Sequence, residues 1–407
     1  MLSGVVSYRS IPKILNLLNN QTNMQMDWIP HFTSTINWIS RVGVGMLKEI
    51  GKIKEPWIAI IDHSINIGTK KLFVVLQIKV DILYKRDKAV SLEDCECIGL
   101  KVCDVVNGES VKSDLEEVFK IAGNPSAIIK DTDYTLNKGV ALYNKTQEKP
   151  ILLIEDISHI VAKSLKKEFE QTKSYKKFTK LISDGSARIR NTNIAFLTPP
   201  KLRNKARFQN VSRLGKWGEK MMEHFNIRGR AKKGSILEKL RLAFPAFSKL
   251  KPFILNFSKT TSVTSQVMKR LKNRGLEQST YNDCKLMLKE LPKSSRTAKL
   301  LRDWLDKHLE IQKELSPYPM PISSDIIESL FGKFKYIIEK SPQSDMNHSI
   351  LIIPLLCGKI SGHRILNALN SVSQKELEEW KKKHIGKTMR MKRIDFLNQN
   401  IQKVGKN

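Results

Sequence analysis

The sequence of 407 residues is poor in features that mark several large protein classes. A membrane-spanning helix needs roughly 20 consecutive apolar residues, and the longest apolar runs, at 72–76 and 350–356, are far shorter. The N-terminus has no long apolar segment followed by a small-residue cleavage site. We therefore predict neither a signal peptide nor contact with a membrane interior.

Cysteine is also scarce, with five residues and no CxxC pair. Cys95, Cys97 and Cys103 lie close together in the sequence, but they lack the ligand spacing of a structural zinc site. So few cysteines in a chain of this size exclude a small disulfide scaffold and favour reduced thiols in the cytoplasm.

The phosphate-binding patterns GxGxxG and GxxxxGK[ST] are absent too, which argues against a dinucleotide-binding fold and a P-loop NTPase.

Positive charge is what the chain has in excess. It carries 71 Lys+Arg against 40 Asp+Glu, a formal net charge of +31, while its 41% of hydrophobic residues suffices for a sizeable core. Residues 157–315 hold 37 of the basic and 13 of the acidic residues, a net +24. Because basic residues also cluster at 201–207, 228–233 and 269–274, this segment predicts a surface for the nucleic-acid backbone.

The basic segment has the apolar spacing of helices and no alternating strand pattern. The predicted helices are 163–180, 215–225, 236–247, 264–274, 281–291 and 295–315. Glycines and prolines, such as Gly234 and Pro292, separate them. The sequence therefore predicts a large all-α basic domain.

Residues 50–170 have a different pattern, in which short branched apolar runs come first and then alternate with helices. The predicted strands are 57–62, 72–80, 98–106, 127–130 and 151–155, and the predicted helices are 113–122, 134–144 and 158–170. Three successive strands followed by this alternation predict an α/β fold, a mixed five-stranded sheet with helices on both faces.

Acidic residues stand at three informative places. Asp62 ends the first predicted strand, Asp131 directly follows the fourth, and Glu328 lies in the first turn of a helix that follows a proline-rich stretch. Asp133 is the alternative to Asp131 as second acid. Carboxylates on neighbouring strand ends and a helix can hold two Mg²⁺ ions for phosphodiester cleavage, and an ordinary surface role remains the alternative for Glu328.

The segments WIAIIDHS, AIIKDTDYTLNKGV and SSDIIESLFGKFK carry a resemblance to a known family. They resemble the RNase H-like superfamily and, within it, the DDE transposases of bacterial insertion sequences. The resemblance implies a catalytic and metal-binding set of Asp62, Asp131 and Glu328. It also implies two Mg²⁺ ions, with Mn²⁺ as an alternative, and a helical domain inserted before the Glu-bearing helix.

The implied function is DNA transposition, with hydrolysis and strand transfer at transposon ends. The chain would bind double-stranded DNA and would form a homodimer or a larger assembly on it. It would be located in the cytoplasm, on a bacterial nucleoid. The alternatives are an RNase H-like nuclease or resolvase without strand transfer, and a catalytically decayed remnant that only binds DNA.

The predicted domains and DNA contacts complete the set of expectations. The domains are an N-terminal helical region (1–50), the first part of the core (51–170), the basic insertion (171–316), the Glu-bearing helix (317–345) and a C-terminal helical region (346–407). The candidate DNA contacts are Lys333, Lys335, His159, Arg203, Arg207, Arg228, Arg230, Arg270 and Arg274. For His159 the sequence leaves two interpretations. In one, Asp156 or Ser158 caps the helix and His159 packs beside the sheet; in the other, His159 lies near the metal site.

Overall fold

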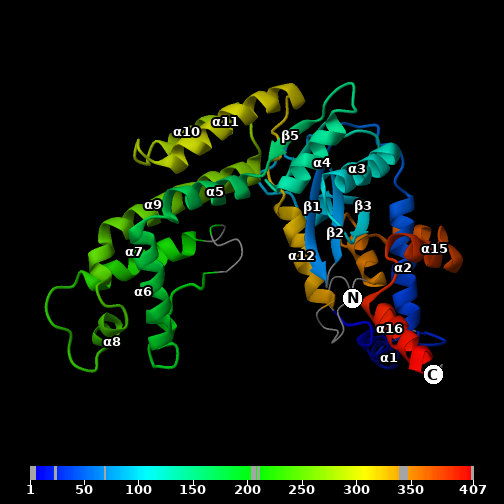
Figure 1. Cartoon of the computed structure of the whole chain (residues 1–407), viewed down its shortest axis with the longest axis horizontal. Coiled ribbons are helices and arrows are strands. Elements are labelled where there is room, and N and C mark those ends of the chain that lie inside the picture. Colours follow the sequence, from blue (N-terminus) through cyan, green and yellow to red (C-terminus); the bar gives the residue numbers. More distant parts are fainter. Residues whose placement is uncertain are drawn as a thin grey trace. The chain divides into compact units, whose positions relative to one another are not determined.

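The computed structural model describes residues 6–22, 25–67, 70–202, 208, 211–338 and 347–404. The chain separates into two compact units (Figure 1). The first, the sheet unit, comprises residues 1–82, 90–154 and 324–407, and the second, the helical unit, comprises 83–89 and 155–323. The basic segment 157–315 therefore lies wholly within the helical unit.

A mixed five-stranded sheet forms the centre of the sheet unit. Its strands are β1 (Trp57–Ile67), β2 (Lys70–Lys79), β3 (Glu96–Cys103), β4 (Ala127–Lys130) and β5 (Leu152–Glu155). They lie in the order β3-β2-β1-β4-β5, with β1–β2 and β2–β3 antiparallel and β1–β4 parallel. The predicted α/β class, a mixed five-stranded sheet flanked by helices, is confirmed.

Helices α3 (Gly108–Ala122) and α4 (Tyr134–Asn144) cover one face of the sheet (Figure 1). Their apolar side chains, among them Val111 and Val140, form one buried cluster with alternate residues of β1, namely Trp57, Ala59 and Ile61. Helix α12 (Asp325–Ile338) packs against β1 but contributes no described side chain to that cluster. Since a strand has two faces, α12 covers the opposite one.

Two predicted boundaries near the candidate site were wrong. The first strand does not end at Asp62 but continues to Ile67, because its pairing with β2 resumes beyond an irregularity after His63. The helix predicted from Ser113 begins at Gly108, because the side chain of Asn107 accepts a hydrogen bond from the Ser110 backbone N–H and caps it there.

The remaining helices of the sheet unit come from both ends of the chain. They are α1 (Ser10–Gln21), α2 (Phe32–Lys48), α13 (Ile352–Leu355), α14 (Gly362–Asn370), α15 (Gln374–His384) and α16 (Met389–Val404). Helix α2 packs against α13, α14 and α15. A side chain at Gly43 or Gly45 would collide with the backbone at Leu351 or Ala368, so glycine permits this close contact. The region before the sheet thus packs on the C-terminal region.

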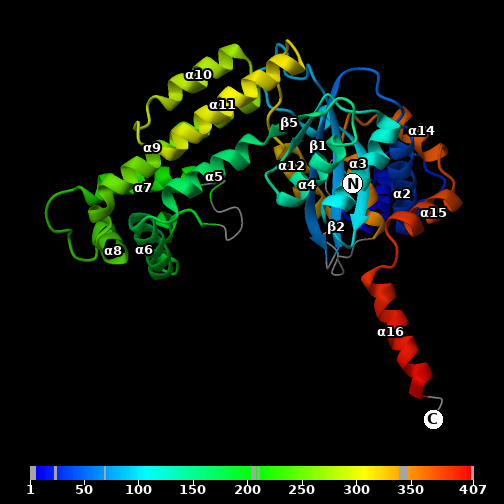
Figure 2. The same cartoon turned by 45° about the horizontal axis from the view of Figure 1, so that its top comes forward.

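The helical unit contains no strand among its described residues, as predicted for the basic segment. Its helices are α5 (Ile157–Phe169), α6 (Lys173–Ile189), α7 (Ser212–Phe225), α8 (Ile236–Ala243), α9 (Lys251–Arg274), α10 (Gln278–Leu288) and α11 (Arg296–Leu315) (Figure 2). Helix α5, which the sequence assigned to the core, packs against α9 and α11. Aromatic rings fill the interior of the helical unit. They include Phe169, Tyr175, Phe178 and Phe257.

All five cysteines are free and buried. In the described part of the chain, no helix combines the length and apolar character needed to cross a membrane.

Candidate active site

Asp62 and Asp131 stand at matching positions on two neighbouring strands. Strands β1 and β4 run parallel, with Ile58 opposite Ala127 and Ile60 opposite Ile129. The same offset, extended two residues past Ile129 and one residue past the end of β4, would set Asp131 level with Asp62. Adjacent strands lie about 4.8 Å apart, so this register brings the two residues to neighbouring backbone positions.

The alternation of side chains decides which face of the sheet these acids occupy. Ala59 and Ile61 of β1 and Ile128 of β4 belong to the cluster beneath α3 and α4. Asp62 is the next residue after Ile61, and Asp131 is three residues after Ile128. Because successive side chains on a strand point to opposite faces, both acids belong to the face that α12 covers.

Glu328 lies in the first turn of α12, the helix that packs against β1. The helix begins at Asp325 because three prolines, Pro317, Pro319 and Pro321, prevent α11 from continuing. Ile327, Leu330 and other apolar residues are buried, whereas Glu328 is exposed at the edge of this buried stripe. The third acid is therefore on the element that covers the face of Asp62 and Asp131.

The local structure distinguishes Asp131 from Asp133. The carboxylate of Asp133 accepts hydrogen bonds from the backbone N–H groups of Thr135 (2.8 Å) and Leu136 (3.1 Å), which makes it the N-cap of α4. Asp131 accepts one from the Asp133 N–H at 2.8 Å and is half-buried. The geometry thus gives Asp133 a structural task and favours Asp131 as the functional acid.

The donor set suits a hard divalent cation. Asp62 and Asp131 are half-buried and Glu328 is exposed, so these carboxylates lie at the boundary between core and solvent. Mg²⁺ prefers carboxylate and water oxygens and keeps part of its hydration shell. Carboxylates at such a boundary fit that preference, since water can complete the coordination.

Two lysines of α12 follow Glu328. Lys333 and Lys335 are both exposed, while Phe334 between them is buried. Lys335 is seven residues from Glu328, close to two full turns, so both lie on nearly the same side of the helix. The two exposed lysines, Lys333 and Lys335, are therefore available to a phosphate backbone near the acids.

His159 belongs to the helical unit, and the predicted capping of its helix by Asp156 is confirmed. The fully buried Asp156 caps α5 by accepting a hydrogen bond from the His159 backbone N–H at 2.9 Å. The His159 ring lies against the same carboxylate, with Nδ1 and Oδ1 3.3 Å apart. The residue therefore helps to fix the start of α5.

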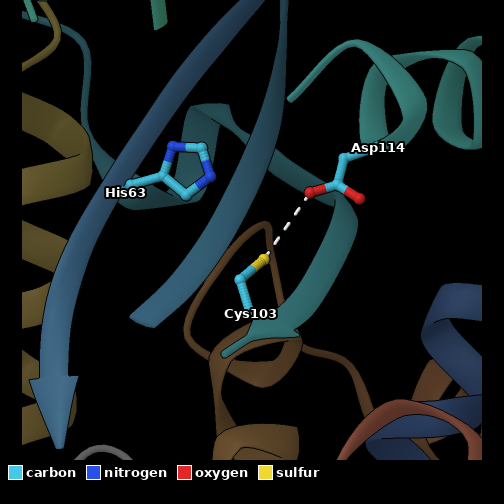
Figure 3. Close-up of side chains that lie close together, drawn as sticks. All are labelled: His63, Cys103 and Asp114. Carbon is cyan, nitrogen blue, oxygen red and sulfur yellow. Dashed lines mark hydrogen bonds between the residues drawn. The ribbon is translucent and has the colours of Figure 1, made fainter. Parts of the chain in front are cut away.

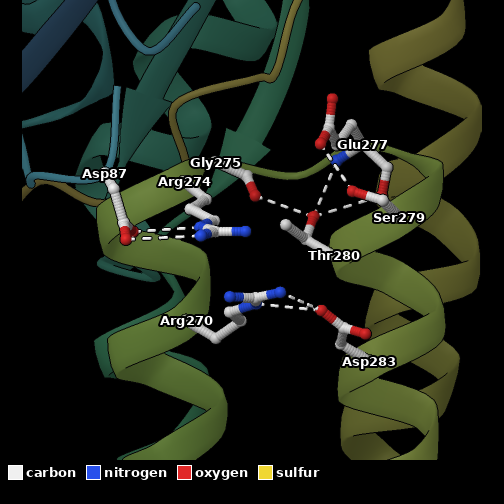
Figure 4. A network of polar contacts seen from close by, with 8 residues as sticks. All are labelled: Asp87, Arg270, Arg274, Gly275, Glu277, Ser279, Thr280 and Asp283. Carbon is white, nitrogen blue, oxygen red and sulfur yellow. Dashed lines mark hydrogen bonds and ion pairs between the residues drawn. The ribbon is translucent and has the colours of Figure 1, made fainter. Parts of the chain in front are cut away.

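The candidate arginines of the helical unit fall into three groups. Arg203 and Arg207 lie outside the described residues. Arg228 and Arg230 are exposed in a loop after α7, and neither forms an ion pair within the described part of the chain. Arg270 and Arg274, by contrast, project from α9 toward carboxylates (Figure 4).

Those two α9 arginines are engaged within the helical unit. Arg270 forms an ion pair with Asp283 of α10, and Arg274 Nε lies 3.0 Å from the Asp87 carboxylate. The ion pair between Arg274 and Asp87 lowers the pKa of Asp87 and raises the pKa of Arg274. Their charge is thus partly neutralised within the chain, whereas Arg228 and Arg230 form no ion pair among the described residues.

A second polar cluster lies on the α3 face of the sheet and was missed at the sequence level. It combines His63 of β1, Cys103 at the end of β3 and Asp114 of α3 (Figure 3), with one ligand atom of each within 4.8 Å of the others. The signal that was missed is a polar residue at a position where the pattern expects an apolar one. His63 continues the every-second-residue spacing of the buried Ala59 and Ile61, and Asp114 directly precedes the buried Leu115.

Burial controls the protonation of this second cluster. It lowers the pKa of His63 to about 4 and raises the pKa of the Cys103 thiol to about 12. Burial also raises the pKa of Asp114, although Lys101 Nζ lies 2.6 Å from its Oδ1 and acts in the opposite direction. At neutral pH the imidazole and the thiol are therefore both uncharged.

Comparisons with known proteins give little further guidance. No family model matches the chain, and neither does any curated protein. Among solved structures it is similar to the Drosophila P element transposase strand transfer complex, with 10% sequence identity over 90% of each chain and a TM-score of 0.42. A likeness this distant carries no argument about function, which must rest on the geometry of the site.

Proposed function

We propose that this chain is a DNA transposase of the DDE type, in which Asp62, Asp131 and Glu328 form the catalytic centre. The observation that carries the proposal is the parallel pairing of β1 with β4 beside the Glu328 helix, because this register, extended past the end of β4, would bring Asp131 level with Asp62. Three carboxylates from two strands and a helix are the donors that a two-metal phosphodiester site needs.

The three carboxylates would hold divalent cations, Mg²⁺ or Mn²⁺. When bound, such ions neutralise charge on the attacking and leaving oxygens of a phosphodiester. The protein's own part is to fix the carboxylates on a rigid sheet and helix and to hold the DNA. Lys333 and Lys335 on α12 would pair with phosphates close to the scissile bond.

The helical unit would hold the DNA backbone. Its segment 157–315 carries a net charge of +24, and phosphate contacts of this kind are independent of base sequence. Such contacts favour a clamp on the duplex backbone. On this proposal the chain would act on DNA ends as a homodimer or a larger assembly.

The test is a metal-dependent cleavage and joining assay with the purified full chain. Labelled duplexes from the DNA that flanks the gene are incubated with supercoiled plasmid and Mg²⁺. We expect the wild type to cut and to join a labelled 3′-OH end to plasmid. Asp62→Asn and Glu328→Gln should each lower both rates by at least about 100-fold, because each removes a metal ligand.

The matched control is Glu116→Gln, which removes an exposed carboxylate from α3 on the other face of the sheet. It should retain wild-type activity. Cutting without joining would favour the nuclease or resolvase alternative, and DNA binding without either reaction would favour the decayed remnant. Equal activity in the wild type and in Asp62→Asn would refute the assigned centre.

A further inference from the structure

The His63, Cys103 and Asp114 side chains come from three elements and converge on one point of the α3 face (Figure 3). One ligand atom of each lies within 4.8 Å of the other two. Alternation on β1 turns His63 to the opposite face of the sheet from Asp62. The cluster is therefore separate from the three carboxylates of the proposed catalytic centre.

Both ring nitrogens of His63 are buried, and neither has a hydrogen-bond partner among the described residues. A buried polar atom without a partner costs about 1–3 kcal/mol, so such atoms normally have a partner. The ring is held in place by stacking on Phe73, with centroids 4.5 Å apart. The imidazole is thus fixed in orientation and lacks the ligand that would satisfy it.

The other two members are already connected. Cys103 Sγ donates a hydrogen bond to Asp114 Oδ2 at 3.6 Å, and Lys101 Nζ lies 2.6 Å from the other oxygen, Oδ1. A cation could replace the thiol proton between Sγ and Oδ2 while Lys101 kept its place on Oδ1. An ammonium group held against the other oxygen in this way would orient the ligating carboxylate.

We propose that His63, Cys103 and Asp114 form a binding site for a borderline transition-metal cation, with Zn²⁺ as the best match. Imidazole nitrogen, thiolate sulfur and carboxylate oxygen are the ligands that Zn²⁺ takes in proteins. Binding releases the Cys103 thiol proton to solvent, and a water completes a four-coordinate site. No bond other than S–H breaks, and no electron is transferred.

The spacing is compatible with this assignment. Zinc binds sulfur at about 2.3 Å and nitrogen or oxygen at about 2.0–2.2 Å, so ligand atoms in a tetrahedral site lie roughly 3.3–3.8 Å apart. The observed limit of 4.8 Å exceeds this range by about 1 Å, so binding would draw the Cys103 and Asp114 side chains toward the fixed imidazole. An ion here would tie β1, β3 and α3 together beside Asp62.

The experiment uses Co²⁺ as a spectroscopic probe for the full chain under reducing conditions. Cobalt bound to a thiolate gives a sulfur-to-metal charge-transfer band in the near ultraviolet, which an all-carboxylate site cannot give. A result at this site is therefore independent of the proposed catalytic centre. We expect the wild type to show the band, and we expect added Zn²⁺ to abolish it.

Cys103→Ser should eliminate the band, and Asp114→Asn should weaken Co²⁺ binding by at least about tenfold. The control is Cys97→Ser, a buried cysteine on the same strand β3, which should keep the band. Zn²⁺ should also raise the melting temperature of the wild type and of Cys97→Ser but not that of Cys103→Ser.

Two results would overturn the site. One is a folded wild type that shows no charge-transfer band at millimolar Co²⁺. The other is a band that persists in Cys103→Ser and disappears in Cys97→Ser. If Cys103→Ser fails to fold by circular dichroism, Asp114→Asn and His63→Ala decide the matter, since unchanged Co²⁺ affinity in both would equally exclude the site.

Discussion

At the scale of single residues, Asp131 and Asp133 show how neighbouring acids acquire different tasks. Asp133 caps α4 through two backbone hydrogen bonds, whereas Asp131 extends the register that β4 shares with β1. Both are aspartates two positions apart, and the sequence pattern fits either as the second acid. The three-dimensional context makes Asp133 the cap of α4, and Asp131 is the second acid of the proposed centre.

This difference predicts opposite phenotypes for two alanine variants. Asp133→Ala should lower the free energy of unfolding by about 1 kcal/mol, the usual effect of a lost N-cap, while the folded protein keeps its cleavage rate. Asp131→Ala should lose metal-dependent cleavage without that loss of stability. Urea unfolding and the cleavage assay measure the two effects, and the reverse pattern would make Asp133 the second acid.

A buried histidine makes the helical unit sensitive to acid. His308 of α11 is fully buried, its Nδ1 bonds to the Trp304 carbonyl at 2.8 Å, and its Nε2 accepts the Glu155 backbone N–H at 3.1 Å. Burial lowers the pKa of His308 to about 4; the nearby Lys307 lowers it further, and Glu155 opposes both.

The sign of the pH dependence follows from that shift. The folded state holds the His308 imidazole in its neutral form, so its pKa is lower than in the unfolded state. The stability that neutral His308 contributes is therefore fully present above pH 6.5 and is lost as the pH falls toward 4. We expect the free energy of unfolding of the helical unit to fall by up to about 3 kcal/mol over this range. His308→Gln should flatten the curve, and His224→Gln, an exposed histidine of α7, should leave it unchanged. Identical curves for wild type and His308→Gln would contradict the prediction.

At the scale of elements, the packing of α3 on α4 depends on a missing side chain. A Cβ on Gly139 of α4 would lie 2.3 Å from Cβ and 2.4 Å from Cγ1 of Val111 on α3. Two helices can approach this closely only where one of them has no Cβ. The contact fixes α4, and with it the segment that follows Asp131.

Glycine-to-alanine variants of two helices test this element-scale contact. Gly139→Ala should lower the free energy of unfolding by about 1–3 kcal/mol because the added methyl overpacks the interface. Gly332→Ala in α12 meets no atom within 4 Å and should raise stability by up to about 1 kcal/mol through helix propensity. Thermal or urea unfolding compares them, and equal effects would show that the close contact is unimportant.

At the scale of the whole molecule, the charge is divided unequally between the two units. The segment 157–315 holds +24 of the +31 and lies in the helical unit, whereas the three candidate acids lie in the sheet unit. DNA binding and phosphodiester chemistry are thus expected from different parts of the chain. Binding should then depend steeply on salt, because each neutralised phosphate releases counterions.

The salt dependence of DNA affinity distinguishes free from paired arginines. Replacing both Arg228 and Arg230 by alanine should weaken binding on every duplex and reduce the slope of log affinity against log salt by roughly 2. Arg274→Ala should have a smaller effect, since Asp87 already neutralises part of its charge. Fluorescence anisotropy at several salt concentrations measures the slopes. A larger effect from Arg274→Ala would reverse this ranking.

Much of the fold was predictable because its signals are local. The β4 and α4 boundaries agree with the predicted ranges 127–130 and 134–144, since apolar periodicity and an aspartate cap act over a few residues. The start of α3 was misplaced because the capping Asn107 looks like part of a turn. The α9 prediction began 13 residues late, at Thr264 instead of Lys251, because the polar run at 258–262 interrupts the apolar pattern although Ser258, Thr260 and Thr261 are buried.

The sequence by itself determined the strand order along the chain, the helical nature of the basic segment and the position of its charge, because each depends on residues that are neighbours in the chain. Only the tertiary structure decided that β4 pairs in parallel with β1, that His63 meets Cys103 and Asp114, and that Arg270 pairs with Asp283. These contacts join distant segments, and their register depends on how whole faces pack together. That packing determines the two faces of the sheet unit on which we propose the three-acid centre and the zinc site.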